Sequence, residues 1–192
     1  MRRIFIFMSV LIFLGLAAYG IYFVISLPKE NPKVLSSQTV ATISLSSGKC
    51  HALQVDLFDP QAFIPDPNCT PGVIDIGVTQ ENIYETICKA GYTKTVRPPV
   101  AYTNNLKAQQ IVEYGYRDTN LKDYEEDHFI SLELGGSPAD PKNLWPEPGA
   151  SFNEKDNAEN YLHSQVCSGA MSLKDAQALI AKNWYEVYKR MR

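Results

Sequence analysis

The residues of this chain that are best suited to chemistry are Asp127 and His128, an acid and a histidine side by side. Adjacent residues on an extended strand point to opposite sides, so one side chain can face a metal ion while the other faces water. A neutral histidine is a suitable general base near pH 7. Phosphodiester hydrolysis needs such a base, together with a cation that neutralises the charge developing around phosphorus. The pair therefore suits metal-assisted hydrolysis. Alone it would be a solvated acid beside a capping histidine, and it predicts this chemistry only together with the glycines and the asparagine that follow.

A glycine turn and an asparagine follow this pair at short distance. Gly135 and Gly136 interrupt an apolar run at 129–134, and Asn143 begins a second short run at 143–145. Two short apolar runs separated by glycine and proline predict a β-hairpin. We expect the first strand at 129–134, with the acid and the histidine at its start. The second strand would end at Pro146, because proline cannot donate to a ladder.

This order of motifs resembles that of the HNH nucleases, whose core is a β-hairpin packed on a helix around one divalent metal ion. The resemblance implies that Asp127 is a metal ligand and His128 the general base. It also implies that Asn143 holds the hairpin loop and so orients the base. The last metal ligand would come from the helix that follows or from just before it, where the candidates are Asn153, Asp156, Asn160 and His163.

The choice among these last ligands decides which metal is expected. Asp156 and Asn160 are one helical turn apart on a polar stripe and are the first choice. An all-oxygen site of this kind favours Mg²⁺ or Mn²⁺, whereas His163 as a ligand would admit Zn²⁺ or Ni²⁺. Glu125 and Glu126, beside the pair, make the position more suitable for a metal and less suitable for DNA.

The resemblance extends over about residues 68–192, to a group of exported bacterial and phage proteins with an HNH-nuclease-like C-terminal half. It implies an α+β fold: a mainly helical domain with a ββα-metal, HNH-like core at about 124–168. The further motifs that carry it are Val78–Ile83, Thr86–Cys88, Gly91–Thr93, Val96–Pro99, Asn143–Pro146, Lys155–His163 and Val166–Cys167.

Four helices are expected from capping residues and apolar spacing. They run from Thr79 to Gly91, from Thr103 to Gly115, from about Ser151 to Cys167, and onward from Ser172. Tyr92–Pro99 is expected to be extended, because its prolines disfavour helix. The expected buried stripe of the third helix is Ala158, Tyr161, Leu162 and Val166. The last helix should bury Ala176, Leu179, Ile180, Trp184 and Val187.

The N-terminal segment predicts export. Ile4–Leu27 contains no charged residue and is long enough to cross a bilayer, and Arg2 and Arg3 before it place the N-terminus in the cytoplasm. We expect an uncleaved transmembrane anchor at 4–27, since the apolar run is longer than a signal-peptide core. The alternative is secretion after cleavage. A linker at 28–48, with a short strand at Val40–Leu45, would precede an extracytoplasmic domain at 49–192.

The four cysteines agree with an oxidising compartment. They are widely spaced and include no Cys-x-x-Cys pair, so two disulfides are expected rather than a zinc clasp. Three pairings are open, and we expect Cys69–Cys88 as one of the two bonds. The cysteines are Cys50, Cys69, Cys88 and Cys167.

Charge limits the kind of partner. The chain carries a net charge of −3, which becomes −5 once Arg2 and Arg3 are set aside. A surplus of acid argues against a protein that coats DNA with high affinity. The expected partner is nucleic acid, DNA rather than RNA, bound weakly, besides the membrane and an envelope or immunity protein. Two functions follow: a metal-dependent HNH-type endonuclease, and a disulfide-stapled envelope binding module that has lost catalysis.

Overall fold

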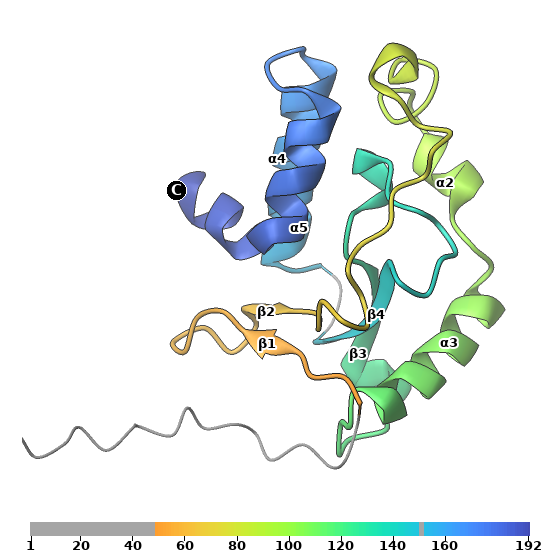
Figure 1. The fold of residues 1–192 in the computed structure, drawn as a ribbon, viewed down its shortest axis with the longest axis vertical. Helices are drawn as coiled ribbons and strands as arrows, with labels where there is room; N and C mark the ends of the chain where they lie inside the picture. The colour runs from red at the N-terminus through yellow and green to blue at the C-terminus, as the bar shows by residue number, and fades with distance from the viewer. Residues whose placement is uncertain (1–48, 150–151) are drawn as a thin grey trace, which may run out of the picture. The chain divides into compact units, whose positions relative to one another are not determined.

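The computed structural model describes residues 49–149 and 152–192, which form four α-helices and two small antiparallel sheets (Figure 1). This confirms the expected mixture of helices and strands. The predicted transmembrane anchor at 4–27, the linker at 28–48 and the strand at Val40–Leu45 lie outside the described residues. Among the helices that are described, none combines the length and the apolar character that crossing a membrane requires.

The hairpin that carries Asp127 and His128 begins earlier in the chain than expected. Strand β3 is Tyr124–His128, and it pairs with β4, Leu144–Pro148, so that His128 lies opposite Leu144. The expected strand at 129–134 is therefore wrong. That segment is a loop ending in a 3₁₀ turn, Leu132–Leu134. Its apolar side chains are all buried. Ile130 and Leu134 enter one hydrophobic cluster of the domain and Phe129 enters the other, instead of alternating across one sheet.

Two prolines lie inside β4, where the sequence predicted that proline would end the strand. Pro146 lies opposite Glu126, and Pro148 lies opposite Tyr124. The two prolines are two residues apart, so their backbone nitrogens face the same edge of the strand. A strand in a two-stranded sheet always has one edge that needs no ladder hydrogen bond, and proline is tolerated where its nitrogen faces that edge.

The segment before the hairpin contains less helix at its start and more helix afterwards than expected. The predicted helix from Thr79 is only a 3₁₀ turn, Gln80–Asn82, followed by turns. The stretch expected to be extended contains the short helix α2, Tyr92–Val96, with Arg97 as its C-cap. Arg97 is extended, as the residue before a proline usually is. Helix α3, Val100–Glu113, begins directly after Pro99, three residues earlier than predicted.

The last two helices lie side by side (Figure 1). Helix α4 is Glu154–Cys167 and α5 is Leu173–Arg190. The side chain of Asn153 caps α4, and that of Ser172 caps α5. The stripe predicted for α4 is buried except at Tyr161, which is 39% exposed, and Lys155 takes a buried place instead. The stripe predicted for α5 is buried, except that Leu179 is only partly covered.

Both expected disulfides are present, but their pairing differs from the predicted one. The bonds are Cys50–Cys69 and Cys88–Cys167, so the expected Cys69–Cys88 bond is wrong. Cys50 belongs to the cluster around Trp145, next to the two-stranded sheet of β1, Leu53–Gln54, and β2, Phe63–Ile64. Cys88 instead meets the end of α4. The fold places each cysteine beside a partner that sequence distance does not reveal.

Candidate functional site

A cavity of about 110 Å³ lies beside β3. Its walls come from β3, from the end of α2, from the loop after His128 and from α4. Four of the residues singled out in the sequence line it: Asp127, His128, Asp156 and Asn160. Asn143 and His163 do not. Four side chains from two distant segments thus meet in one place.

His128 is held in a single orientation at the cavity wall. The residue is 5% exposed, and its Nε2 lies 2.9 Å from the carbonyl oxygen of Pro138. Because a carbonyl can only accept, Nε2 carries the proton, which leaves Nδ1 with a lone pair. Burial lowers the pKa of His128, so the ring is neutral near pH 7.

Asn143 ties the loop that follows His128. Its Oδ1 accepts from the backbone nitrogen of Ile130 at 3.0 Å and from that of Val73 at 3.3 Å. Its Nδ2 donates to the carbonyl oxygens of Ile130 and Ser137, each at 3.0 Å. The residue is fully buried. All four hydrogen-bonding positions of the amide are therefore used to fix the loop next to the histidine.

Gly136 allows this loop to close. A Cβ atom at Gly136 would lie 1.7 Å from the carbonyl oxygen of Ile130 and 2.8 Å from Nδ2 of Asn143. Its neighbour Gly135 has φ +71°, in the left-handed region that favours glycine. The Gly-Gly pair thus serves close backbone approach, together with the turn that the sequence predicted.

Asp127 is engaged by two donors from the fold itself. Its Oδ2 accepts from Trp145 Nε1 at 3.2 Å and forms an ion pair with Lys155 Nζ at 2.9 Å. The Lys155 ammonium also donates to the carbonyl oxygen of His128 at 3.1 Å and contacts the carboxylate of Glu159. Sequence patterns assign no role to Lys155, although it lies three residues before Ala158 on the buried stripe of α4.

The charges around Lys155 are unevenly satisfied. Burial alone would lower the pKa of Lys155, but the carboxylates of Asp127, Glu159 and Glu147 together raise it, so the ammonium stays charged. Burial raises the pKa of Glu159 to about 8, although Lys155 opposes the shift. Burial also raises the pKa of Glu147, whose Oε2 accepts a hydrogen bond from Nδ2 of Asn153 at 3.4 Å. One cation is thus surrounded by more acid than it can neutralise.

Several oxygens on the cavity wall are buried without any partner in the described structure. They are both carboxylate oxygens of Glu126, the hydroxyl oxygen of Ser131 and Oε2 of Glu133. Burial raises the pKa of Glu126 to about 8. From the sequence, Glu126 is expected only as a neighbour of the Asp127–His128 pair, and Ser131 and Glu133 are expected within an apolar strand. Because the segment of Ser131 and Glu133 is a loop and not a strand, these two residues line the cavity.

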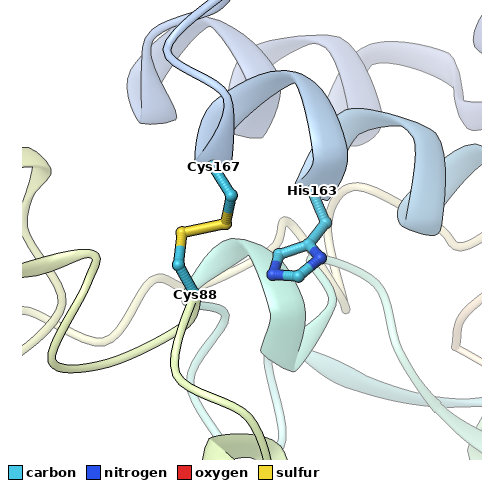
Figure 2. Close-up of side chains that lie close together, drawn as sticks. All are labelled: Cys88, His163 and Cys167. Atoms are coloured by element: carbon cyan, nitrogen blue, oxygen red, sulfur yellow. A yellow bond between two sulfur atoms is a disulfide. The ribbon is translucent and has the colours of Figure 1, made fainter.

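His163 lies in a different place, beside the disulfide at the end of α4 (Figure 2). Its Nε2 is 3.0 Å from the carbonyl oxygen of Ile87. Ligand atoms of Cys88, His163 and Cys167 all lie within 4.8 Å of one another, so this group could hold a metal ion. Thiolates are the cysteine form that binds metals. Since both sulfurs are joined to each other, the group becomes available only after reduction.

Comparison with known proteins adds no further identification. No family model matches this chain, and no match was found among curated proteins or solved structures. The function must therefore be argued from the cavity.

Proposed function

We propose that this protein is a metal-dependent phosphodiesterase of the HNH type that hydrolyses nucleic acid at the cavity beside β3. The observation that carries the proposal is the orientation of His128. Its proton sits on Nε2, against Pro138, and its neutral Nδ1 is left as a base at the wall of an acidic cavity. We further propose that the domain works outside the cytoplasm, on the exported side of the predicted anchor at 4–27.

In this proposal, His128 removes a proton from a water molecule through Nδ1. The bond from Nε2 to the carbonyl of Pro138 fixes the ring and stabilises the imidazolium that results, because a carbonyl oxygen attracts the shared proton more strongly once the ring is charged. The loop held by Asn143 keeps Pro138 in place. The lowered pKa of His128 keeps the base unprotonated at neutral pH.

The cavity suits a divalent cation. When bound, such a cation neutralises the charge on the phosphate and stabilises the leaving oxygen. Two sets of oxygen atoms line the cavity: those of Asp127, Asp156 and Asn160, which the resemblance implies, and the unpartnered oxygens of the wall. Oxygen ligands of this kind fit Mg²⁺ or Mn²⁺. The buried oxygens without partners are the observation that supports this fit.

Basic side chains near the cavity support a polyanionic substrate. Arg97 lines the cavity itself. A second cavity, of about 610 Å³, shares Glu125 and Glu126 with the first and is lined by Lys107 and Lys122. Guanidinium and ammonium groups bind phosphate oxygens. They give a net acidic protein a local place for a phosphate chain.

The test is hydrolysis of supercoiled plasmid by the full-length, disulfide-bonded protein with Mg²⁺, Mn²⁺ or Zn²⁺. We expect metal-dependent nicking that EDTA abolishes and that His128→Ala reduces by about 100-fold or more, the range for loss of a general base. Added imidazole should restore part of the activity of His128→Ala, because it can take the place of the missing ring.

His51→Ala is the matched control, since His51 is an exposed histidine away from the cavity. It should nick at the wild-type rate. Thermal unfolding of each variant shows whether the fold is intact. Absence of nicking with every metal, from a folded protein, would remove the nuclease proposal.

One observation favours a second function, that of a binding module without catalysis. The carboxylate of Asp127 is already paired with Lys155 and Trp145, so the ligand that the resemblance implies is partly used by the fold. A folded, inactive protein that retains a specific envelope ligand in direct binding measurements would support this second function.

A further inference from the structure

The unpartnered oxygens of the domain gather at one cavity. Four of the six buried side-chain oxygens that lack a hydrogen-bond partner in the described residues belong to Glu126, Ser131 and Glu133. All three residues line the cavity beside β3. A buried polar atom without a partner costs about 1–3 kcal/mol, and more if it is charged. Such a gathering indicates a ligand that satisfies several oxygens at once.

Ser131 shows that this is more than a group of surface acids. The residue is 3% exposed, and its hydroxyl oxygen still has no partner. A hydroxyl can rotate to suit either a donor or an acceptor, so a serine buried in this loop would ordinarily bond to a nearby carbonyl. Ser131 lines the same cavity as Glu126 and Glu133, whose unpartnered oxygens are Oε1 and Oε2 of Glu126 and Oε2 of Glu133, and its own free oxygen can supply a neutral ligand for a cation.

Asp127 differs from these residues because its carboxylate already forms an ion pair and a hydrogen bond within the fold. Lys155 and Trp145 both bond to its Oδ2. A cation there would have to compete with a fully buried ammonium at 2.9 Å. In the described residues, no donor bonds to the unpartnered oxygens of Glu126 and Glu133. Lys107 acts on Glu126 through its charge, which lowers the pKa of that carboxyl group against the larger effect of burial.

We propose that Glu126, Ser131 and Glu133 hold the divalent cation of this cavity, in place of Asp127, Asp156 and Asn160. In the described part of the chain, one group of three acidic, histidine or cysteine residues has its ligand atoms within 4.8 Å of one another, and it consists of Cys88, His163 and Cys167. Among the described residues, the cavity beside β3 has no such complete group, so it offers only part of the coordination shell of a cation. Mg²⁺ and Mn²⁺ suit such a shell, because Mg²⁺ in particular keeps several waters and takes one or two carboxylates.

The inference deepens the proposed function and rests on it only for the chemistry that the cation supplies. Its test is binding of Mn²⁺ to the full-length, disulfide-bonded protein, measured by titration calorimetry and by the loss of the free Mn²⁺ resonance signal. Glu126→Gln and Glu133→Gln should each weaken binding at least tenfold, and Ser131→Ala should weaken it several-fold. These changes preserve side-chain volume closely.

The matched control is Glu85→Gln, which removes an exposed carboxylate away from the cavity. It should bind Mn²⁺ within twofold of wild type. The rise in unfolding temperature on adding Mn²⁺ gives a second readout, since a ligand of the folded state stabilises it. That rise should vanish in Glu126→Gln and persist in Glu85→Gln.

Two results would overturn the inference: a wild-type protein that binds no Mn²⁺, and wild-type binding by both Glu126→Gln and Glu133→Gln. Plasmid nicking separates this inference from the proposed function. If Mn²⁺ binds as expected but no nicking occurs, the cation site is supported and the nuclease proposal is wrong. If nicking is normal in both glutamine variants, the nuclease proposal is supported and this cation site is wrong.

Discussion

At the scale of single residues, the chemistry of the cavity depends on how donors and acceptors are matched. In His128, Nε2 donates to the carbonyl oxygen of Pro138, so the lone pair of the neutral ring is on Nδ1. In Asn143, by contrast, both hydrogen atoms and both lone pairs of the amide are used in hydrogen bonds to the backbone. The sequence motif could name both residues. It could not show which of their atoms form hydrogen bonds that hold the fold together.

Asn143→Ala should destabilise the domain by at least about 3 kcal/mol. The change removes four hydrogen bonds and leaves buried backbone groups of Ile130 unsatisfied, each at a cost of about 1–3 kcal/mol. Chemical denaturation of the oxidised protein measures the loss. Asn157→Ala on the exposed side of α4 is the control and should cost less than about 1 kcal/mol. Equal losses in the two variants would show that the loop does not depend on this amide.

At the scale of elements, the loop between β3 and β4 decides the site. The apolar residues after His128 looked like a strand, because apolar character alone does not separate a strand from a buried loop. In the structure, Phe129 and Ile130 enter different hydrophobic clusters. This divergence stops the ladder at His128 and turns Ser131 and Glu133 toward the cavity.

The two disulfides should contribute unequally to stability. Cys88–Cys167 closes a loop of 79 residues, and Cys50–Cys69 closes one of 19. In the chain-entropy model, these loops correspond to about 4.5 and about 3.2 kcal/mol. Replacing Cys88 and Cys167 by serine should therefore lower the free energy of unfolding more than the same change at Cys50 and Cys69. Denaturation of the two double variants decides the order, and the reverse order would contradict it.

At the scale of the whole molecule, the net charge limits how the substrate is bound. The chain is acidic overall, and the basic side chains at the two cavities are few: Arg97, Lys107 and Lys122. Each neutralised phosphate releases counterions and adds about 0.7–0.9 to the salt slope. Binding should therefore be weak and only moderately sensitive to salt.

The affinity of His128→Ala for a short oligonucleotide should fall with salt along a log–log slope no steeper than about −3. Fluorescence anisotropy at several salt concentrations measures it without hydrolysis. Lys122→Gln should make the slope shallower by about one, while Lys189→Gln, at the far end of α5, should leave it unchanged. A slope of about −6 would mean that a basic surface outside the two cavities binds the substrate.

The sequence by itself determined the local features: the Asp127–His128 pair, the glycine turn, the asparagine of the loop, the capping residue Ser172 and the buried spacing of the last two helices. These depend on neighbours a few residues apart, so their signals are present in the pattern. It also predicted two disulfides, since cysteine number and spacing carry that information.

Only the tertiary structure decided which partners meet across the fold. The Cys88–Cys167 pairing, the burial of Lys155 against Asp127, and the placement of Asp156 and Asn160, but not His163, at the cavity all depend on how α4 lies against the rest of the domain. Hydrogen bonds and ion pairs between distant segments are set by packing, which fills the core in one arrangement among many that share the same pattern. For that reason the motif located the cavity, and the packing selected which of its atoms are free.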